Sequence, residues 1–354
     1  MSGPSFLAFT DRGEALARDL ARALGGEAMR SGKPETLREW TEKRFVSGGA
    51  LVFVGAVGIA VRALAPYVDK KWKDPAVVAV DECGRFAVPL LSGHLGGANR
   101  LARAIAELCG ATPVVTTATD LHALFAVDDW ARVQNLCVVE PERIRTVSAK
   151  VLAGGTLRLW SRFPIEGTPP AEVELLSTPP AGEESGAPSG ESSPAPDVFL
   201  SVHREDGTAL HLAPRAVVLG VGCRRGISRE SIEDAFAAFL AQSGLLPKAV
   251  RTVASIDLKK DEEGLLAFCR AHGWPLETRS ARELNETPGN FTPSPFVRSV
   301  TGTDNVCERS AAAISGGPVL ARKFTAQGVT LAAAQKPLSL TWDWGQQERD
   351  ERKG

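Results

Sequence analysis

The segment 90–99, with the sequence LLSGHLGGAN, joins an apolar strand pattern to an amphipathic helical pattern through a glycine-rich turn. Such a turn presents backbone N–H groups at the N-terminus of a helix, where anions bind. Further apolar segments typical of buried strands alternate with helical patterns, at residues 6–9, 50–55, 76–81 and 112–116. This alternation predicts an N-terminal doubly wound, mainly parallel α/β sheet with ligands at the carboxyl ends of its strands.

Changes in composition along the 354 residues predict several domains. The expected boundaries are 1–130 for the N-terminal α/β domain, 131–213 for a small α+β middle domain, 214–340 for a C-terminal mixed α/β domain, and 341–354 for a charged tail, whose final segment QQERDERKG should fray. Residues 164–196 are rich in Pro, Gly, Ser and Glu, which predicts a disordered insert in the middle domain. A hairpin around Asp206 and Gly207 is expected to complete that domain.

Charge and cysteine usage exclude several classes of partner. A formal net charge of -1 argues against nucleic-acid binding, and no apolar run reaches the length of a membrane span. The N-terminal residues lack the pattern of a signal peptide. The six cysteines are far apart and form no CxxC pair, which indicates a cytoplasmic protein without zinc or iron–sulfur ligation.

The histidines narrow the possible chemistry. None of the five shares an HxH or HExxH spacing, so the sequence gives no support to a protein-bound catalytic metal. A GxSxG motif is also missing, which leaves a serine-hydrolase triad without support. General acid–base catalysis by His94 with a carboxylate remains. Asp81, Asp120 and Asp128 are expected at the same edge of the sheet, although each could instead cap a helix, the interpretation we favour for Asp128.

Several polar residues have two interpretations each. Ser92 is expected to hydrogen-bond a substrate or the turn itself, and His122 could be a surface residue. Arg62 and the Lys70–Lys71 pair could neutralise an acidic ligand or form a solvated face. In the segment 216–228, AVVLGVGCRRGIS, the glycine spacing differs from the dinucleotide motif GxGxxG, so an anion-binding turn with Arg224 and Arg225 is favoured over a nucleotide site.

Taken together, these motifs resemble the cobalt-precorrin-5A hydrolase (CbiG) family of cobalamin biosynthesis. The matching N-terminal segments are GIAVRALAPYV, DPAVVAVDECGRF, LLSGHLGGANRLARAIA and VVTTATD, followed by Phe125-Ala126-Val127-Asp128. The segments GVGCRRG, the Ser294 loop and GTDNVCERSAA resemble the last domain of that family. The resemblance covers roughly residues 50–336. The sequence departs from the family pattern at residues 122–124, where a glycine is expected, and at Cys307.

The resemblance implies a reaction: opening of a δ-lactone on a cobalt-corrinoid intermediate, with loss of a two-carbon unit as acetaldehyde. His94 would act as base or acid, oriented by Asp81 or Asp120, while Gly93, Gly96 and Gly97 would form an anion-binding turn. The further substrate-binding residues implied are Gly58, Arg62, Ser92, Asn99, Thr116, Thr117, Thr119, Gly222, Arg224, Ser294 and Glu308. Cobalt would arrive inside the macrocycle, so no cofactor or protein metal site is expected.

Two other functions remain open at this point. A corrinoid carrier that hands intermediates between pathway enzymes would need the carboxylate-binding residues but neither His94 nor Asp120. A nucleotide-dependent α/β enzyme is a third hypothesis. Transient contact with other enzymes of cobalamin biosynthesis is an expectation under either corrinoid hypothesis.

Overall fold

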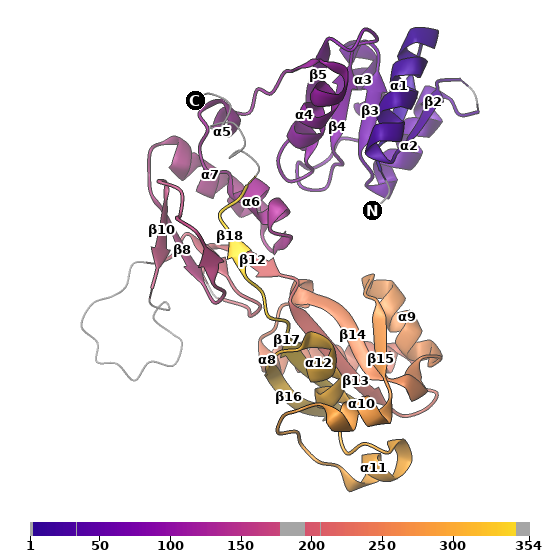
Figure 1. The fold of residues 1–354 in the computed structure, drawn as a ribbon, viewed down its shortest axis with the longest axis vertical. Coiled ribbons are helices and arrows are strands. Elements are labelled where there is room, and N and C mark those ends of the chain that lie inside the picture. The colour runs from indigo at the N-terminus through magenta and orange to yellow at the C-terminus, as the bar shows by residue number, and fades with distance from the viewer. Residues whose placement is uncertain (1–2, 33, 178–194, 206, 345–354) are drawn as a thin grey trace.

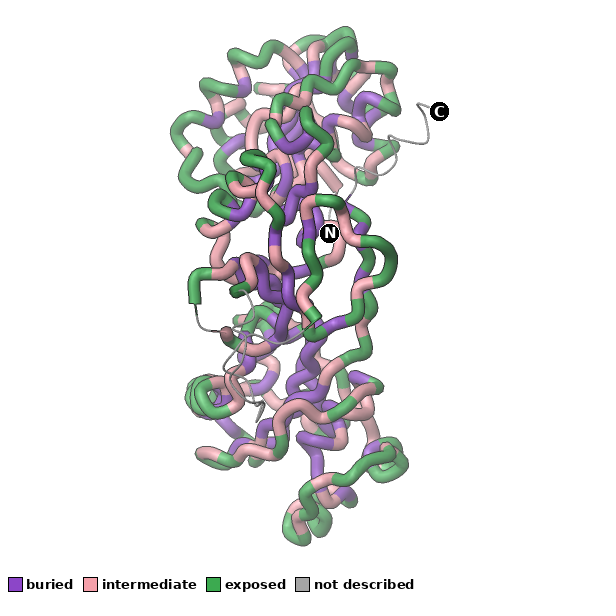
Figure 2. Tube along the Cα trace, turned by 90° about the vertical axis from the view of Figure 1, so that its left-hand side faces the viewer, coloured by how far each residue is buried: buried purple, intermediate pink, exposed green. Residues whose placement is uncertain are grey.

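The computed structural model describes residues 3–32, 34–177, 195–205 and 207–344. Three lobes, each built on its own sheet, follow one another along an elongated molecule (Figure 1). Buried residues lie inside each lobe and exposed residues cover the outer helices and loops (Figure 2). Among these described residues, no helix is both long enough and apolar enough to cross a membrane.

The first lobe is a six-stranded sheet with the order β2-β1-β3-β4-β5-β6, covered by helices on both faces. Its strands are β1 (Ser5–Ala8), β2 (Glu27–Arg30), β3 (Leu51–Val54), β4 (Val77–Val80), β5 (Phe86–Leu91) and β6 (Thr112–Pro113), and its helices are α1 (Asp11–Leu24), α2 (Leu37–Ser47), α3 (Val57–Leu64) and α4 (Ala98–Cys109). Strands β1 to β4 are mutually parallel, which confirms the doubly wound, mainly parallel α/β prediction. Thr10, rather than Asp11, caps α1.

Strand β5 reverses direction, and this reversal decides which residues can meet. It pairs antiparallel with β4, so that Leu91 lies beside Val77 and Ala87 beside Val80. The carboxyl end of β5 therefore lies at the opposite edge of the sheet from the carboxyl ends of β3 and β4. In any antiparallel hairpin, the carboxyl ends of the two strands lie at opposite edges of the sheet.

The middle lobe is a five-stranded sheet with the order β10-β8-β11-β12-β7, in which only β7 is antiparallel to its neighbour. Its elements are α5 (Ala118–Leu121), α6 (Val127–Val133), β7 (Leu136–Val138), the 3-10 helix η1 (Pro141–Arg143), α7 (Ile144–Leu152), β8 (Leu157–Ser161), β9 (Ile165–Glu166), β10 (Val173–Leu176), β11 (Val198–Leu200) and β12 (Leu210–Pro214).

Two expectations for this lobe are wrong. Strands β11 and β12 pair in parallel, with Val198 beside Leu210, so the chain between them crosses over instead of forming a hairpin at Asp206 and Gly207. The expected insert 164–196 begins too early, because β9 and β10 lie within it and Val173 is buried. Residues 178–194 lie outside the described part of the chain.

The third lobe has the sheet order β15-β14-β13-β17-β16, a parallel half joined to an antiparallel hairpin, as expected for a mixed α/β domain. Its elements are β13 (Val217–Cys223), α8 (Arg229–Ser243), η2 (Pro247–Ala249), β14 (Val250–Ile256), η3 (Asp257–Lys259), α9 (Glu263–His272), β15 (Leu276–Arg279), α10 (Ala281–Glu286), α11 (Pro295–Thr301), α12 (Cys307–Ser315), β16 (Val319–Ala326) and β17 (Val329–Gln335).

After the third lobe the chain returns to the middle lobe. Strand β18 (Leu340–Thr341) pairs with β9, and the rings of Trp342 and Trp130 stack with centroids 5.4 Å apart. The indole N–H of Trp130 donates to the Thr341 carbonyl at 2.8 Å, and Trp342 and Trp344 are both buried. The expected tail boundary at 341 is therefore wrong for 341–344, which pack on the middle lobe, while the segment 346–354 that was expected to fray lies outside the described residues.

Candidate active site

The loop after β5 is a tight turn that fixes the position of His94. Ser92 has a positive φ of 54° and its hydroxyl donates to the carbonyl of Asp74 at 2.6 Å. A Cβ on Gly96 would lie 2.8 Å from the Ser92 carbonyl oxygen, so only glycine fits at that position. The N–H groups of Gly97, Ala98 and Asn99 all donate to carbonyls within the loop. Of the three glycines expected to bind an anion, Gly97 therefore has its N–H group already bonded within the loop.

The imidazole of His94 lies between two carboxylates. Its Nε2 is 2.6 Å from Asp120 Oδ2 and its Nδ1 is 3.3 Å from Asp128 Oδ1. Burial alone would lower the pKa of His94, but hydrogen bonds and charge from the two aspartates outweigh burial and raise it to about 10. Both ring nitrogens therefore carry protons at neutral pH, and His94 is a buried imidazolium.

Asp120 is the centre of the polar cluster. It accepts hydrogen bonds from Asn99 Nδ2 at 2.9 Å and from Arg103, in addition to its contact with His94. Burial opposes ionisation of Asp120, but His94 and Arg103 lower its pKa to about 2. Asn99 also donates to Thr117 Oγ1 at 3.0 Å. This arrangement fixes Asp120 as a carboxylate aimed at the imidazole.

The cluster joins two lobes. His94, Asn99 and Arg103 come from the first lobe, on the loop after β5 and on α4. Asp120 and Asp128 lie on α5 and α6, which contact α7 of the middle lobe. Neighbours of these aspartates, Phe125, Val127 and Trp130, belong to the core of the middle lobe. The expected domain boundary at 130 therefore places α5 on the wrong side of the junction and cuts through α6.

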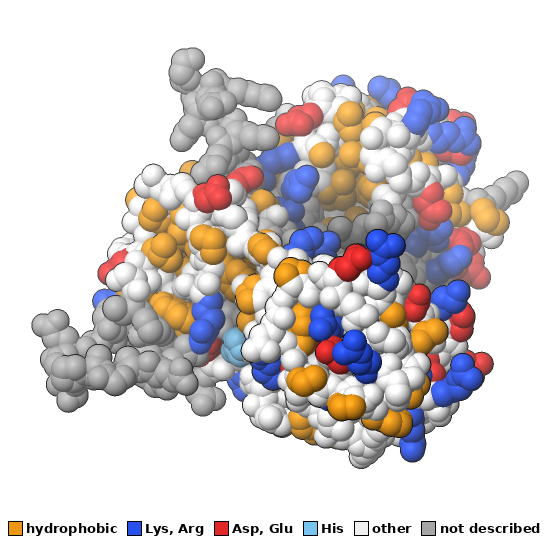
Figure 3. All heavy atoms as spheres, turned by 60° about the horizontal axis from the view of Figure 1, so that its bottom comes forward, with side chains coloured by type: hydrophobic (Ala, Val, Ile, Leu, Met, Phe, Trp, Pro, Cys, Tyr) orange, Lys and Arg blue, Asp and Glu red, His pale blue; other side chains and the backbone are white. Residues whose placement is uncertain are grey.

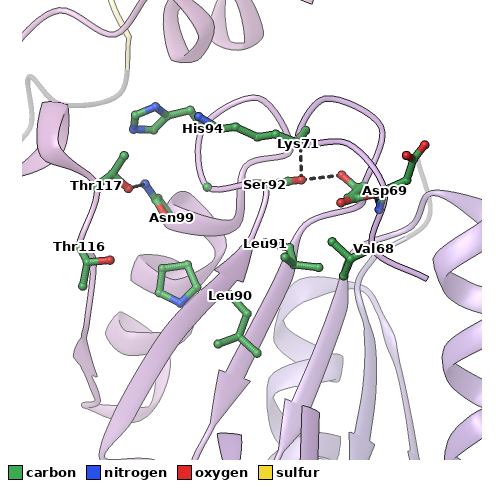
Figure 4. Close-up of a pocket in the computed structure, with 13 residues that line it drawn as sticks. Val68, Asp69, Lys71, Leu90, Leu91, Ser92, His94, Asn99, Thr116 and Thr117 are labelled. Atoms are coloured by element: carbon green, nitrogen blue, oxygen red, sulfur yellow. Dashed lines mark hydrogen bonds between the residues drawn. The ribbon is translucent and has the colours of Figure 1, made fainter. Parts of the chain in front are cut away.

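Two cavities adjoin this cluster. The first, of about 360 Å³, is lined by His94, Ser92, Gly93, Asn99, Thr116 and Thr117 from the predicted set, together with Val68, Asp69, Lys71, Asp74, Pro89, Leu90 and Leu91 (Figure 4). The second, of about 590 Å³, lies against α7 and is lined in part by Asp128. Lys71 borders both cavities, so they flank one side chain at the junction of the two lobes.

Asp81 does not belong to this site. Its carboxylate accepts hydrogen bonds from the backbone N–H groups of Cys83, Arg85 and Phe86, at 2.7 to 2.9 Å, and holds the β4–β5 turn. That turn lies at the sheet edge opposite His94. The prediction that Asp81 could orient His94 is wrong.

Gly58 and Arg62 are also away from the cavities. Helix α3 begins at the carboxyl end of β3, on the edge that Asp81 occupies. Arg62 is exposed and its guanidinium donates to the Gly58 carbonyl at 3.0 Å. Neither residue lines the first or the second cavity, so their predicted contact with substrate has no support here.

The predicted residues of the third lobe have structural contacts within that lobe. Glu308 is fully buried and accepts from the backbone N–H groups of Thr292 and Lys323, and Ser294 caps α11. Gly222 lies within β13, and the backbone N–H of Arg224 donates to the Gly328 carbonyl. The third lobe lies at the other end of the molecule from the first lobe, and its far end shows basic and acidic side chains interspersed (Figures 1 and 3). These residues do not join His94 in one site.

Sequence reasoning missed Arg103, although it follows Asn99 by four residues on α4, and this spacing on one helix face could have identified it. For Asp128 the helix cap was favoured over a catalytic carboxylate, but Ala126 occupies the N-cap of α6 and Asp128 contacts His94. Lys71 was named as a cation for an acidic ligand, with a solvated face as the alternative, and it lines the first cavity. Thr119, which was expected, lies with its hydroxyl 3.5 Å from His94 Nε2.

The charged cluster predicts a window of pH in which it stabilises the fold. The pKa of His94 is raised from 6.5 to about 10, so its contribution is complete below pH 6.5 and lost as the pH rises through about 10. The pKa of Asp120 is lowered from 3.8 to about 2, so its contribution is present above pH 3.8 and lost toward pH 2. The difference in free energy of unfolding between the wild type and the double variant His94→Ala/Asp120→Ala should therefore be largest between pH 3.8 and pH 6.5. Denaturant titrations across the pH range measure it, and a pH-independent difference would contradict the cluster.

Fold and site together define a class of protein: a three-lobed α/β protein with an imidazolium–carboxylate cluster beside a cavity, an arrangement suited to acid–base chemistry. No group of three or more His, Cys, Asp or Glu side chains in the described ranges is arranged to hold a metal ion. Residues 39–120 match the family model for the N-terminal part of Cobalamin synthesis G, and residues 217–334 match that for its C-terminus.

Relatives over the full length agree with these matches. The chain is 34% identical to the cobalt-precorrin-5A hydrolase of Salmonella typhimurium, over 91% of this chain and 94% of that one. It is 30% identical to the cobalt-precorrin-5A hydrolase of Priestia megaterium, over 83% and 80%. A crystal structure of a cobalamin biosynthesis protein G homolog from Sulfolobus solfataricus aligns with 94% of this chain and 97% of its own, at 19% identity and a TM-score of 0.40. The chain belongs to the cobalt-precorrin-5A hydrolase (CbiG) family, which confirms the resemblance seen in its motifs.

Proposed function

We propose that this protein is a cobalt-precorrin-5A hydrolase, which opens the δ-lactone of a cobalt-corrinoid intermediate and releases acetaldehyde to give cobalt-precorrin-5B in anaerobic cobalamin biosynthesis. The relatives that carry this name match the chain over most of its length. The observation that carries the proposal is the imidazolium of His94, held between Asp120 and Asp128 at the wall of a cavity.

The reaction needs charge stabilisation and proton transfer at two points. Water adds to the lactone carbonyl carbon and the acyl C–O bond breaks, which leaves a carboxyl group and an alkoxide that takes a proton. The resulting alcohol then loses its O–H proton as its C=O bond forms. The bond from this carbon to the macrocycle breaks, its electron pair goes to the ring carbon, and that carbon takes a proton. The sum is one water consumed and one acetaldehyde released.

In this scheme His94 acts as an acid and as an electrostatic stabiliser, not as the base that activates water. Its pKa of about 10 keeps it protonated at neutral pH, and its charge faces the cavity where the oxyanion develops. The N–H groups of residues 97–99 are bonded within the loop, so they are not available to the oxyanion. Lys71 lines the same cavity and supplies a second positive charge there. The two aspartates hold the imidazolium in place.

The substrate supplies the cobalt, so the proposal requires no cofactor and no protein-bound metal. A cavity of about 360 Å³ is too small to enclose a corrinoid, so only the lactone edge of the ring enters it. All six cysteines are free thiols, which supports a cytoplasmic location. Transient contact with neighbouring enzymes of the pathway would protect the labile intermediates.

One observation favours the carrier alternative. His94 is 4% exposed and both its nitrogens contact carboxylates, as a purely structural imidazolium would. The experiment that separates the two functions is incubation of the purified protein with the lactone-bearing cobalt corrinoid. The hydrolase gives a corrinoid whose mass equals substrate plus water minus acetaldehyde, together with trapped acetaldehyde. A carrier gives tight binding and an unchanged mass, and this result would overturn the proposal.

Replacement of Asp81 by alanine tests the conclusion that this residue takes no part in the reaction at His94. Asp81→Ala removes the acceptor of three backbone N–H groups in an exposed turn, so it should lower the free energy of unfolding by about 1–2 kcal/mol. The kcat for acetaldehyde release, measured on the folded protein, should stay within about twofold of the wild type, because Asp81 contacts neither His94 nor either cavity. A loss of kcat with unchanged stability would restore Asp81 to the mechanism.

A further inference from the structure

We propose that the second cavity is a binding subsite for the flat ring and one side-chain carboxylate of the substrate, with Lys71, Trp72 and Arg145 as the residues that bind them. This inference rests on the proposed function and adds a place for the part of the ring that the first cavity cannot hold. The cavity, of about 590 Å³, lies between the turn at residues 70–73 of the first lobe and α7 of the middle lobe.

The lining of the second cavity is suited to an apolar ring with charged substituents. Its apolar part consists of Leu95, Pro141, Ile144, Ala149 and Leu152. A ligand site with an apolar floor and a few charged groups is the usual form of a small-molecule pocket. The charged side chains besides Asp128 are Lys71, Arg145 and Glu142.

The two cations of this cavity are available to a ligand. Arg145 and Lys71 are exposed, and neither forms an ion pair within the described residues. Asp128 pairs with His94, and among the described residues it forms no ion pair with Lys71 or Arg145. Guanidinium and ammonium groups bind carboxylates through charge-assisted hydrogen bonds. Glu142 is exposed on the same wall, so it should repel the same carboxylate that Arg145 attracts.

Trp72 offers an aromatic surface at the cavity. Its side chain is 39% exposed, although tryptophan is usually well buried. Lys70 Nζ lies 5.8 Å from the centroid of the ring, on the periphery of the usual range for a cation–π contact. A large, partly exposed indole next to a cavity is suited to stacking against a flat conjugated ligand.

Lys71 connects the subsite to the reaction site. It lines both cavities, and Asp128, which its charge helps to keep ionised, faces the second cavity while His94 faces the first. A macrocycle seated over Trp72 and Arg145 therefore extends past Lys71 toward His94. Binding energy from the remote edge of the ring would then orient the lactone at the reacting site.

The test uses two probes with the same corrin ring, whose side-chain carboxylates are free in one and esterified in the other: cobyrinic acid, a corrinoid polycarboxylate, and its heptamethyl ester. Titration of the full chain with each probe gives two dissociation constants. Arg145→Ala should weaken binding of cobyrinic acid about tenfold and leave that of the ester within about twofold, since only the acid loses a charge-assisted contact. Glu142→Gln should change binding of the acid in the opposite direction. Trp72→Ala should weaken binding of both probes.

Arg38→Ala is the matched control, because Arg38 is an exposed arginine on α2 that lines neither cavity. Equal effects of Arg145→Ala and Arg38→Ala, or the same sign for Arg145→Ala and Glu142→Gln, would overturn the subsite. With the lactone substrate, Arg145→Ala should lower kcat/KM, whereas Arg38→Ala should leave it unchanged. A wild type that releases no acetaldehyde would refute the proposed function, while the probe titrations would still decide the subsite.

Discussion

Replacement of His94 by alanine is expected to lower kcat for acetaldehyde release by at least about 100-fold, the usual range for removal of a positioned acid. The variant removes the positive charge at the wall of the first cavity and the proton donor for the leaving groups. An assay that couples released acetaldehyde to an alcohol dehydrogenase measures the rate directly. Turnover should be measured at saturating substrate, so that weaker substrate binding is not mistaken for a lower kcat.

His122→Ala is the matched control for this prediction. His122 is two residues beyond Asp120 but is exposed, and it lines neither cavity, so its removal should leave kcat within about twofold. His94→Ala also leaves Asp120 and Asp128 without their shared partner, which costs stability. Circular dichroism therefore has to confirm that the variant is folded. Near-normal kcat in a folded His94→Ala protein would remove His94 from the chemistry and favour the carrier.

Replacement of Trp342 by alanine is expected to destabilise the middle lobe by about 3–5 kcal/mol, the usual cost of truncating a buried aromatic residue. Trp342 is 3% exposed, and its ring stacks on Trp130 and packs edge-on against Phe125. The variant leaves a cavity in the core that positions α6 and its Asp128. Urea unfolding followed by fluorescence and circular dichroism measures the loss.

Trp72→Ala serves as the control for Trp342→Ala, because both remove an indole and only one indole is buried. Trp72 is 39% exposed, so its replacement should change the free energy of unfolding by less than about 1 kcal/mol. Equal losses of free energy of unfolding in the two variants would show that the segment 341–344 is not part of the core. A truncation after Leu340 should lower the free energy of unfolding by more than Trp342→Ala does, since it removes the same ring together with buried Trp344 and the Thr341 carbonyl.

Local patterns predicted most of the helices and strands because the relevant forces act within a few residues. The helix after the glycine turn ends at Gly110, whose φ of 73° suits a glycine C-cap, and Ser228 is the N-cap of α8. The apolar periodicity of α4 matches its buried face, with Ala102 and Ile105 inside. These features depend on sequence neighbours, and so a single sequence displays them.

Strand pairing was the least predictable part of the fold. The segments that form β11 and β12 look the same from the sequence whether they pair in parallel or as a hairpin, and packing beyond the turn decides between them. Strand β10 lies in a segment whose average composition predicts disorder, but it pairs with β8 and its Val173 is buried in the core of the middle lobe. Trp342 is likewise buried by residues far away in the chain.

The sequence by itself determined the lobe architecture, the family, and the two motifs that supply His94 and Asp120. Only the tertiary structure decided that Asp128 joins them, that Asp81 lies at the other edge, and that His94 is a cation at neutral pH. The physical reason is that a pKa depends on burial and on charges brought together in space. Those charges come from α5 and α6 in one lobe and from a loop in another, and no local pattern specifies how the two lobes meet.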